Sequence, residues 1–181
     1  YYDLNIGETY AEILPGYQTR VISFNGAVPG PTIRARAGRK VAMTHYNGLP
    51  ATTLGGAPGN VSIHLHGAHC PASEDGYPTQ YITPGSWRTY TYPNNQLPAP
   101  LWYHDHAMDY TGPHVWYGMA GLYLMTDDYE DALNLPKGAY EVPLVIQDRN
   151  FDTNGQLVYT KNMNGETGNT LLVNGTVQPY L

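Results

Sequence analysis

The chain has 181 residues, of which 41% are apolar, and nine lysines and arginines against fifteen aspartates and glutamates give a net charge of −6. This length allows one domain, or slightly more, with a sizeable buried core. The sparse basic charge argues against nucleic acid as a partner, no P-loop or convincing dinucleotide-binding glycine motif occurs, and no apolar run of about 18 residues could span a membrane.

Seventeen tyrosines, with twenty glycines and fifteen prolines at short intervals, favour strands and turns over helices. In chain order, the expected strands are 20–26, 32–38, 40–47, 60–67, 87–93, 101–106, 121–127, 141–149 and 170–175. Short helical turns are expected at 107–117 and 130–136. The strand lengths and the spacing of turns predict an all-β sandwich or barrel.

The expected strand 60–67 carries the first of two His-x-His pairs. Its residues alternate, so Val61, Ile63 and Leu65 project to one face. His64 and His66 project to the other face, about 6.5–7 Å apart at Cα. The two imidazoles therefore point together, away from an apolar face that packs against a core.

The second pair, His104 and His106, lies in the expected strand 101–106 and shares a face with Trp102. Two such pairs on neighbouring strands would form a patch of four imidazoles, which we favour over two unrelated pairs that arose by accident. Imidazole suits zinc, copper, iron and nickel, so the ligand type alone does not choose the metal. The spacing also leaves open whether each pair converges on one ion or spreads over two.

The other three histidines are weaker candidates for metal ligands. His45 lies at a polar strand end and His114 in a loop flanked by glycine and proline. We expect both of them, and His69, to face solvent or to form hydrogen bonds. The alternative for His69 is that it contacts a metal-binding residue without binding the metal itself.

Other metal sites have signatures that this chain lacks. A blue-copper site needs a histidine soon after its cysteine, but the next histidine after Cys70 is His104. A cupin-like site needs a glutamate soon after its His-x-His, whereas Glu74 comes eight residues after His66. The zinc signatures HExxH and CxxC are missing, so a zinc hydrolase stays open without a positive signal.

At the two histidine motifs the sequence resembles the multicopper oxidases. HLHG at 64–67 and WYHDH at 102–106 are similar to the paired copper motifs of that family's first cupredoxin domain. The resemblance covers nearly the whole chain, including FNGAVPGPTIRARAG, DGYPTQYITPGSWRTYTYP, AGLYLMTDDYEDALNLP and LVNGTVQPYL. WYHDHAM and EDALNLP are most similar to the bilirubin oxidases and to laccases of the bacterial spore-coat type.

The resemblance implies a Greek-key β-sandwich of cupredoxin type over residues 1–150, with a linker over 151–181 that leads into a second cupredoxin domain outside this chain. It also implies that His64 binds a type 2 copper, and that His66, His104 and His106 bind a type 3 copper pair. Together these coppers form a trinuclear centre that reduces dioxygen to water. The family's HPxHxH and HCHxxxH motifs, which complete the centre and bind the type 1 copper, are absent from this chain.

The resemblance further assigns a catalytic role to Asp75, as an acid near the type 2 copper that supplies protons. Gly76 would permit a tight turn that points this carboxylate towards the cluster, while the alternative for Asp75 is a turn residue that caps its own backbone. Glu74 does not match the family's pattern and is expected to be solvated. Cys70 is expected not to bind copper, and to be either a buried or loop thiol or half of a disulfide to the missing portion.

We therefore expect the N-terminal part of a copper-dependent oxidoreductase that oxidises a phenolic or tetrapyrrole-like donor. It would be active only with the remaining cupredoxin domains. The alternative is a non-catalytic copper-binding or structural cupredoxin domain. The lack of a signal peptide is expected of a processed mature chain, and the Asn-x-Ser/Thr triplets at Asn60 and Asn174 indicate a secreted glycoprotein.

Overall fold

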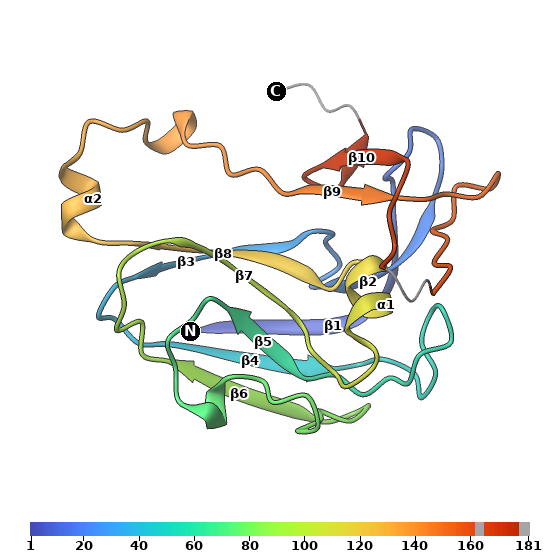
Figure 1. Ribbon diagram of the computed structural model, residues 1–181, viewed down its shortest axis with the longest axis horizontal. Coiled ribbons are helices and arrows are strands. Elements are labelled where there is room, and N and C mark those ends of the chain that lie inside the picture. The colour runs from blue at the N-terminus through green and yellow to red at the C-terminus, as the bar shows by residue number, and fades with distance from the viewer. Residues whose placement is uncertain (162–164, 178–181) are drawn as a thin grey trace.

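The computed structural model describes residues 1–161 and 165–177, which form mostly β-strands (Figure 1). One four-stranded sheet has the order β2-β1-β4-β6 and comprises β1 (Tyr2–Ala11), β2 (Thr19–Phe24), β4 (Val41–Asn47) and β6 (Trp87–Tyr92). The second has the order β3-β8-β7-β5 and comprises β3 (Gly30–Arg36), β5 (Ile63–His66), β7 (Pro100–Asp105) and β8 (Ala120–Thr126). The predicted β-sandwich is confirmed.

The remaining elements are short. A third sheet, ordered β11-β10-β9, contains β9 (Ile146–Arg149), β10 (Thr170–Val173) and β11 (Thr176–Val177). The helices are α1 (Thr111–Trp116), α2 (Asp128–Ala132) and the 3-10 turns η1 (Ala72–Glu74) and η2 (Gly138–Tyr140). Among the described residues, no helix is long and apolar enough to cross a membrane.

One observed strand was not expected, and one expected strand is shorter than predicted. β1 was not predicted, because only Leu4 and Ile6 of its ten residues are buried and apolar, which leaves a weak alternation. The expected strand 141–149 forms only over its last four residues, as β9. Pro143 cannot donate to a sheet, and the apolar Val142 and Leu144 are exposed there.

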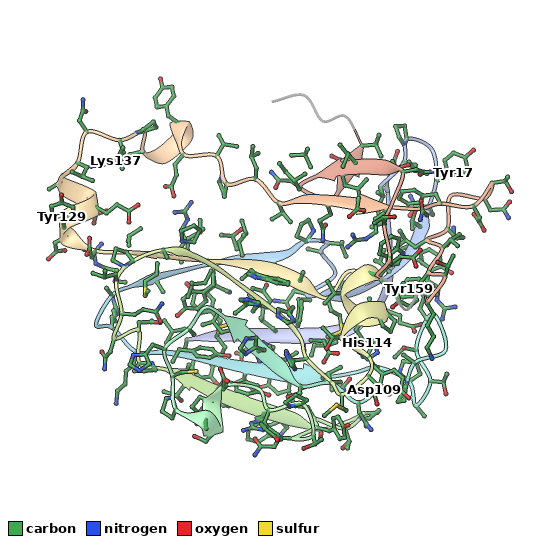
Figure 2. All side chains as sticks on the ribbon, in the orientation of Figure 1. Tyr17, Asp109, His114, Tyr129, Lys137 and Tyr159 are labelled. Carbon is green, nitrogen blue, oxygen red and sulfur yellow. The ribbon has the colours of Figure 1, made fainter. Side chains whose placement is uncertain are left out.

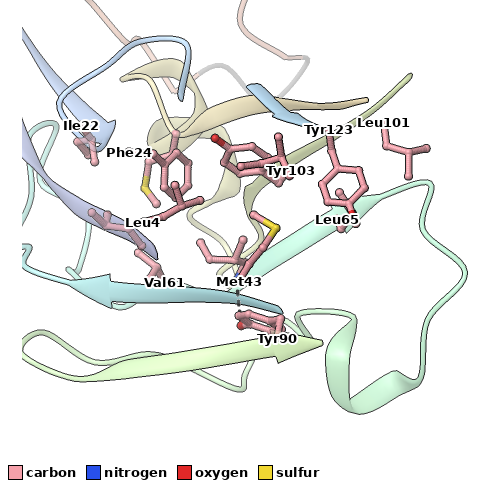
Figure 3. Close-up of a cluster of buried hydrophobic side chains, with 14 of the residues drawn as sticks. Leu4, Ile22, Phe24, Met43, Val61, Leu65, Tyr90, Leu101, Tyr103 and Tyr123 are labelled. Atoms are coloured by element: carbon pink, nitrogen blue, oxygen red, sulfur yellow. Dashed lines mark hydrogen bonds between the residues drawn. The ribbon is translucent and has the colours of Figure 1, made fainter. Parts of the chain in front are cut away.

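Aromatic side chains from both sheets fill the core, as Figure 3 shows. The rings of Phe24 and Tyr103 meet edge to face at 5.0 Å. The Tyr103 hydroxyl donates to the Pro31 carbonyl at 2.7 Å, and the Tyr90 hydroxyl accepts from the Ile63 amide at 3.2 Å. Buried tyrosines thus replace phenylalanine in this core, and Tyr90 holds the start of β5 against the opposite sheet.

The predicted division at residue 150 stays a prediction. The third sheet has β9 before this position and β10 and β11 after it. Residues from the later part also contact the sandwich, since Leu157 and Leu172 belong to the same buried cluster as the two large sheets. The described residues after 149 therefore pack on the sandwich.

Candidate metal centre

The pairing of β5 with β7 brings the two histidine motifs together. The strands are antiparallel, with His64 directly opposite His104 and His66 opposite Trp102. His106 follows the end of β7, and its amide donates to the Ser62 carbonyl at 2.6 Å. The ring of His64 lies 5.2–5.5 Å from the rings of the other three histidines, measured between centroids.

Hydrogen bonds to backbone carbonyls orient two of these rings. His64 Nδ1 lies 2.6 Å from the Asp75 carbonyl oxygen, and His104 Nδ1 lies 2.7 Å from that of Asp105. A carbonyl only accepts, so we assign the ring proton to Nδ1 in both histidines. Their Nε2 atoms are left with a free lone pair, which is the arrangement that a metal ligand requires.

The nitrogens of the patch fit a bound metal. Ligand atoms of His64, His66 and His104 all lie within 4.8 Å of one another, and His66 Nδ1 is 3.4 Å from His104 Nε2. Two nitrogens that each lie about 2.0–2.1 Å from one tetrahedral ion are about 3.3 Å apart. His106 Nδ1 is buried, and within the described part of the chain it has no hydrogen-bond partner.

Burial favours the neutral, metal-binding form of His104. His104 is 4% exposed, and its burial lowers the pKa of its imidazole to about 4. The Trp102 ring stacks on His104 at 4.1 Å and on His66 at 5.1 Å, between centroids. Because a metal binds the unprotonated ring, this environment keeps the ligand available at neutral pH.

The Asp75–Gly76 turn lies against the strand that bears His64. Gly76 has a φ of +73°, and a Cβ there would lie 2.1 Å from the Ile63 carbonyl oxygen. Only glycine fits this approach, as the sequence predicted for a turn pointing back towards the cluster. The Asp75 carboxylate is half exposed, and its Oδ1 lies 3.4 Å from His64 Nδ1. The carboxylate thus lies beside His64, and its role as the acid of the reaction stays a prediction.

Glu74 and Cys70 lie next to Asp75. Glu74 is not simply solvated as expected, because its Oε2 accepts from the Thr91 amide of β6 at 2.7 Å. Cys70 is partly buried, with Sγ 3.6 Å from Asp75 Oδ1. Burial, and then the charge of Asp75, raise the pKa of this thiol to about 11. A disulfide from Cys70 to the missing portion stays a prediction.

The expectation for His45 was wrong. Its ring is fully buried between Phe24 and Tyr90, and neither ring nitrogen has a hydrogen-bond partner among the described residues. The signal was present in the sequence, because the two-residue period of β4 places His45 on the same face as Val41 and Met43. Burial lowers the pKa of His45 to about 3.

The other two histidines do hydrogen-bond or face solvent. His69 is exposed, and its amide donates to Gln96 Oε1 at 2.6 Å. His114 lies on α1 rather than in a loop (Figure 2), and its Nδ1 is 2.7 Å from Asp105 Oδ2. Asp105 was missed as a functional candidate, although the alternation of β7 places its carboxylate on the face opposite to His104. An acid on the interior face of a strand is itself a signal.

Comparisons with known proteins agree with this geometry. A family model described as multicopper oxidase matches residues 5–130. A laccase of Bacillus stratosphericus is 36% identical over all of this chain and 42% of its own length, and a bilirubin oxidase of Albifimbria verrucaria is 35% identical over 99% of this chain and 31% of its own. The crystal structure of a laccase from Pediococcus acidilactici superimposes with a TM-score of 0.87, at 32% identity over 98% of this chain and 38% of that one. The chain thus spans less than half the length of these relatives.

Proposed function

Because this chain belongs to the multicopper oxidase family, we propose that it is the N-terminal cupredoxin part of a copper oxidase that reduces dioxygen to water. The observation that carries this proposal is the convergence of four imidazoles, two from β5, one from β7 and one from the residue after β7, with ring nitrogens left free for metal. We favour it over a non-catalytic copper-binding domain because the expected set of four histidines is complete.

We assign His64 to the type 2 copper, and His66, His104 and His106 to the type 3 pair. When bound, the coppers supply the electrons for dioxygen reduction, with a type 1 copper expected in the missing part of the enzyme. The chain's own contribution is to hold these imidazoles in place. The carbonyls of Asp75 and Asp105 fix His64 and His104, and Trp102 limits the rotation of the rings that it stacks on.

Asp75 is proposed as the acid of the reaction. Reduction of dioxygen to water consumes protons, and histidines bound to metal cannot deliver them. Asp75 Oδ1 lies close to His64, while half of the side chain is exposed, so the carboxyl group can take up a proton from solvent and hold it beside the cluster. Glu74 is less suited, because the amide of Thr91 occupies one of its oxygens.

The proposed partner is the remainder of the same enzyme, as the same or a cleaved chain. The segment between α2 and β9, on which Figure 2 labels Lys137, runs along the outside of the sandwich. Its apolar side chains are uncovered, with Tyr140 84% and Val142 60% exposed. A groove of about 500 Å³ lies beneath it, lined in part by Leu122 and Leu144. Further cupredoxin domains would bury this apolar surface and complete the copper cluster.

The donor and the location are proposed from weaker observations. The names of the relatives, laccase and bilirubin oxidase, support a small phenolic or tetrapyrrole-like donor. The triplets at Asn60 and Asn174 support a secreted glycoprotein. Asn174 Nδ2 donates to the Pro143 carbonyl at 3.2 Å, and a glycan there would leave one N–H on this nitrogen for that bond. A mass decrease after glycosidase treatment of the secreted protein would confirm glycosylation.

The test compares the full-length enzyme with its His66→Ala and His104→Ala variants, with His69→Ala as a control on the exposed surface outside the patch. Copper per chain and oxygen uptake with a phenolic donor are measured together. We expect the first two variants to lose type 3 copper and oxygen uptake, and the control to keep both. Full copper and normal uptake in either variant would refute the assignment. Copper binding by the wild type without any oxygen uptake would favour the non-catalytic alternative.

A further inference from the structure

Asp105 lies between two proposed ligands, but its side chain points to the opposite face of β7 and is fully buried, like His114. A buried carboxylate is costly unless it is hydrogen-bonded or paired, so its partners show what it stabilises. Asp105 Oδ1 accepts from the Ser62 amide at 2.8 Å. Asp105 Oδ2 accepts from the Ala107 amide at 3.2 Å and lies 2.7 Å from His114 Nδ1.

The hydrogen bonds of the Asp105 carboxylate take the place of backbone bonds between strands, because the pairing of β5 with β7 ends here. The pairing of β5 with β7 ends at Ile63 opposite Asp105. Beyond this pair, the His106 amide still donates to the Ser62 carbonyl, but the Ser62 amide turns to the Asp105 carboxylate. The bond from Ala107 back to the same carboxylate closes a turn around His106. One carboxylate therefore ties the His106 turn to the strand that leads into His64.

His114 holds that carboxylate from the other side. Its amide and carbonyl take part in the backbone bonds of α1 and the turn after it, so its ring position is set by the helix. Its Nε2 contacts Thr53 Oγ1 at 3.5 Å, and that hydroxyl also donates to the Ala57 carbonyl at 2.9 Å. The backbone bonds of α1, rather than the longer Thr53 contact, thus hold the imidazole with Nδ1 facing Asp105.

We propose that Asp105 and His114 are a buried positioning pair for the metal centre. His114 orients the Asp105 carboxylate, and the carboxylate fixes the His106 turn on the end of β5, so that the His106 and His64 rings stay 5.2 Å apart. This inference rests on the proposed function, since it takes both histidines as copper ligands. Groups behind metal ligands typically change metal affinity by about 10–100-fold when they are lost.

The test uses the full-length enzyme with two matched substitutions. In His114→Asn the amide nitrogen of the new side chain takes the place of Nδ1 and still donates to Asp105. In His114→Gln it takes the place of Nε2 and reaches towards Thr53 instead. Thr53→Val is the control, because it removes the contact to Nε2 without touching the bond to Asp105. Copper affinity and the electron paramagnetic resonance spectrum of the type 2 copper are measured, together with hydrogen exchange at the Ser62 and Ala107 amides.

We expect His114→Gln to weaken copper binding by about tenfold or more, to change the type 2 copper spectrum, and to speed exchange at both amides. His114→Asn and Thr53→Val should stay near the wild type. Wild-type behaviour of His114→Gln would overturn the proposal. Equal losses in the Asn and Gln variants would overturn it too, because packing of the ring would then matter rather than Nδ1. If the wild type itself binds no copper, the proposed function fails, while the exchange rates still test the pair.

Discussion

Two regions of the molecule each bury a histidine completely, but only one of them gives the ring a hydrogen-bond partner among the described residues. At the strand ends beside the histidine patch, His114 meets the carboxylate of Asp105 at 2.7 Å. Between the sheets, His45 lies edge-on to Phe24 and Tyr90, at 6.0 and 5.6 Å between ring centroids, with both ring nitrogens unpaired in the described structure. One ring is oriented by a hydrogen bond, and the other is held by packing alone.

The difference shows how the strand ends suit histidines that are proposed to bind a metal. Inside a sheet, the backbone carbonyls are used by the neighbouring strands, so a side chain on the core face finds no acceptor. The carbonyls of Asp75, in the turn after η1, and of Asp105, the last residue of β7, accept instead from His64 and His104. A histidine with one nitrogen bonded in this way offers the other nitrogen to a metal.

The largest effect expected from this contrast is the loss of folding stability at acidic pH that the buried His45 causes. Unfolded His45 binds a proton below its ordinary pKa of 6.5, while the folded ring, with its pKa lowered to about 3, does not. Its contribution to the free energy of unfolding should therefore fall as the pH drops from 6.5 to 3, by up to about 5 kcal/mol. His45→Leu should remove this dependence in the metal-free protein. Urea unfolding between pH 7.5 and 4.5 measures it, and parallel curves for the variant and the wild type would contradict the prediction.

A substitution at Gly76 tests how closely the Asp75–Gly76 turn packs against β5. In Gly76→Ala, a Cβ at a φ of +73° would meet the Ile63 carbonyl, so we expect a loss of about 3 kcal/mol in the free energy of unfolding. Gly85→Ala is the matched control, because Gly85 has a φ of +79° with nothing within 4 Å of its Cβ position, and should cost only about 1 kcal/mol. Equal melting temperatures for the two variants would show that the Asp75–Gly76 turn is not held against β5.

Asp75→Asn separates two roles of this residue, the orientation of His64 by its backbone carbonyl and the proposed proton supply by its carboxylate. The backbone carbonyl that orients His64 is kept, so copper content should not change. Oxygen uptake should slow by about 100-fold, because the amide cannot carry a proton. The loss should be greatest at higher pH, where solvent offers fewer protons in its place. Uptake equal to the wild type across the pH range would reduce Asp75 to a turn residue.

The smallest effect is expected at Cys70. Its thiol lies beside Asp75 but, with its pKa raised to about 11, stays protonated at neutral pH and is a poor metal ligand. Cys70→Ser should leave copper content and the spectra of the assembled enzyme unchanged, and should alter the free energy of unfolding by only about 0.5 kcal/mol. Loss of copper without unfolding would place Cys70 in the metal centre after all.

The β-sandwich, and the shared strand face within each histidine pair, follow from the local pattern of side chains. Alternation along an extended strand is a local property, so it placed His64 with His66, and His104 with His106, before any contact was known. The same alternation along β4 predicts that His45 is buried, since it shares a face with Val41 and Met43. The polar character of the residue alone does not predict this. In β1 the same signal was too weak, because only two of its ten residues are buried and apolar.

The way in which the two histidine motifs meet depends on strand pairing, which is not a local property. His64 lies opposite His104, forty residues further along the chain, because β5 and β7 pair in that register. The bond between Asp105 and His114 likewise depends on where α1 packs against the end of β7. Register and packing arise from contacts between distant segments, which no local pattern of side chains encodes.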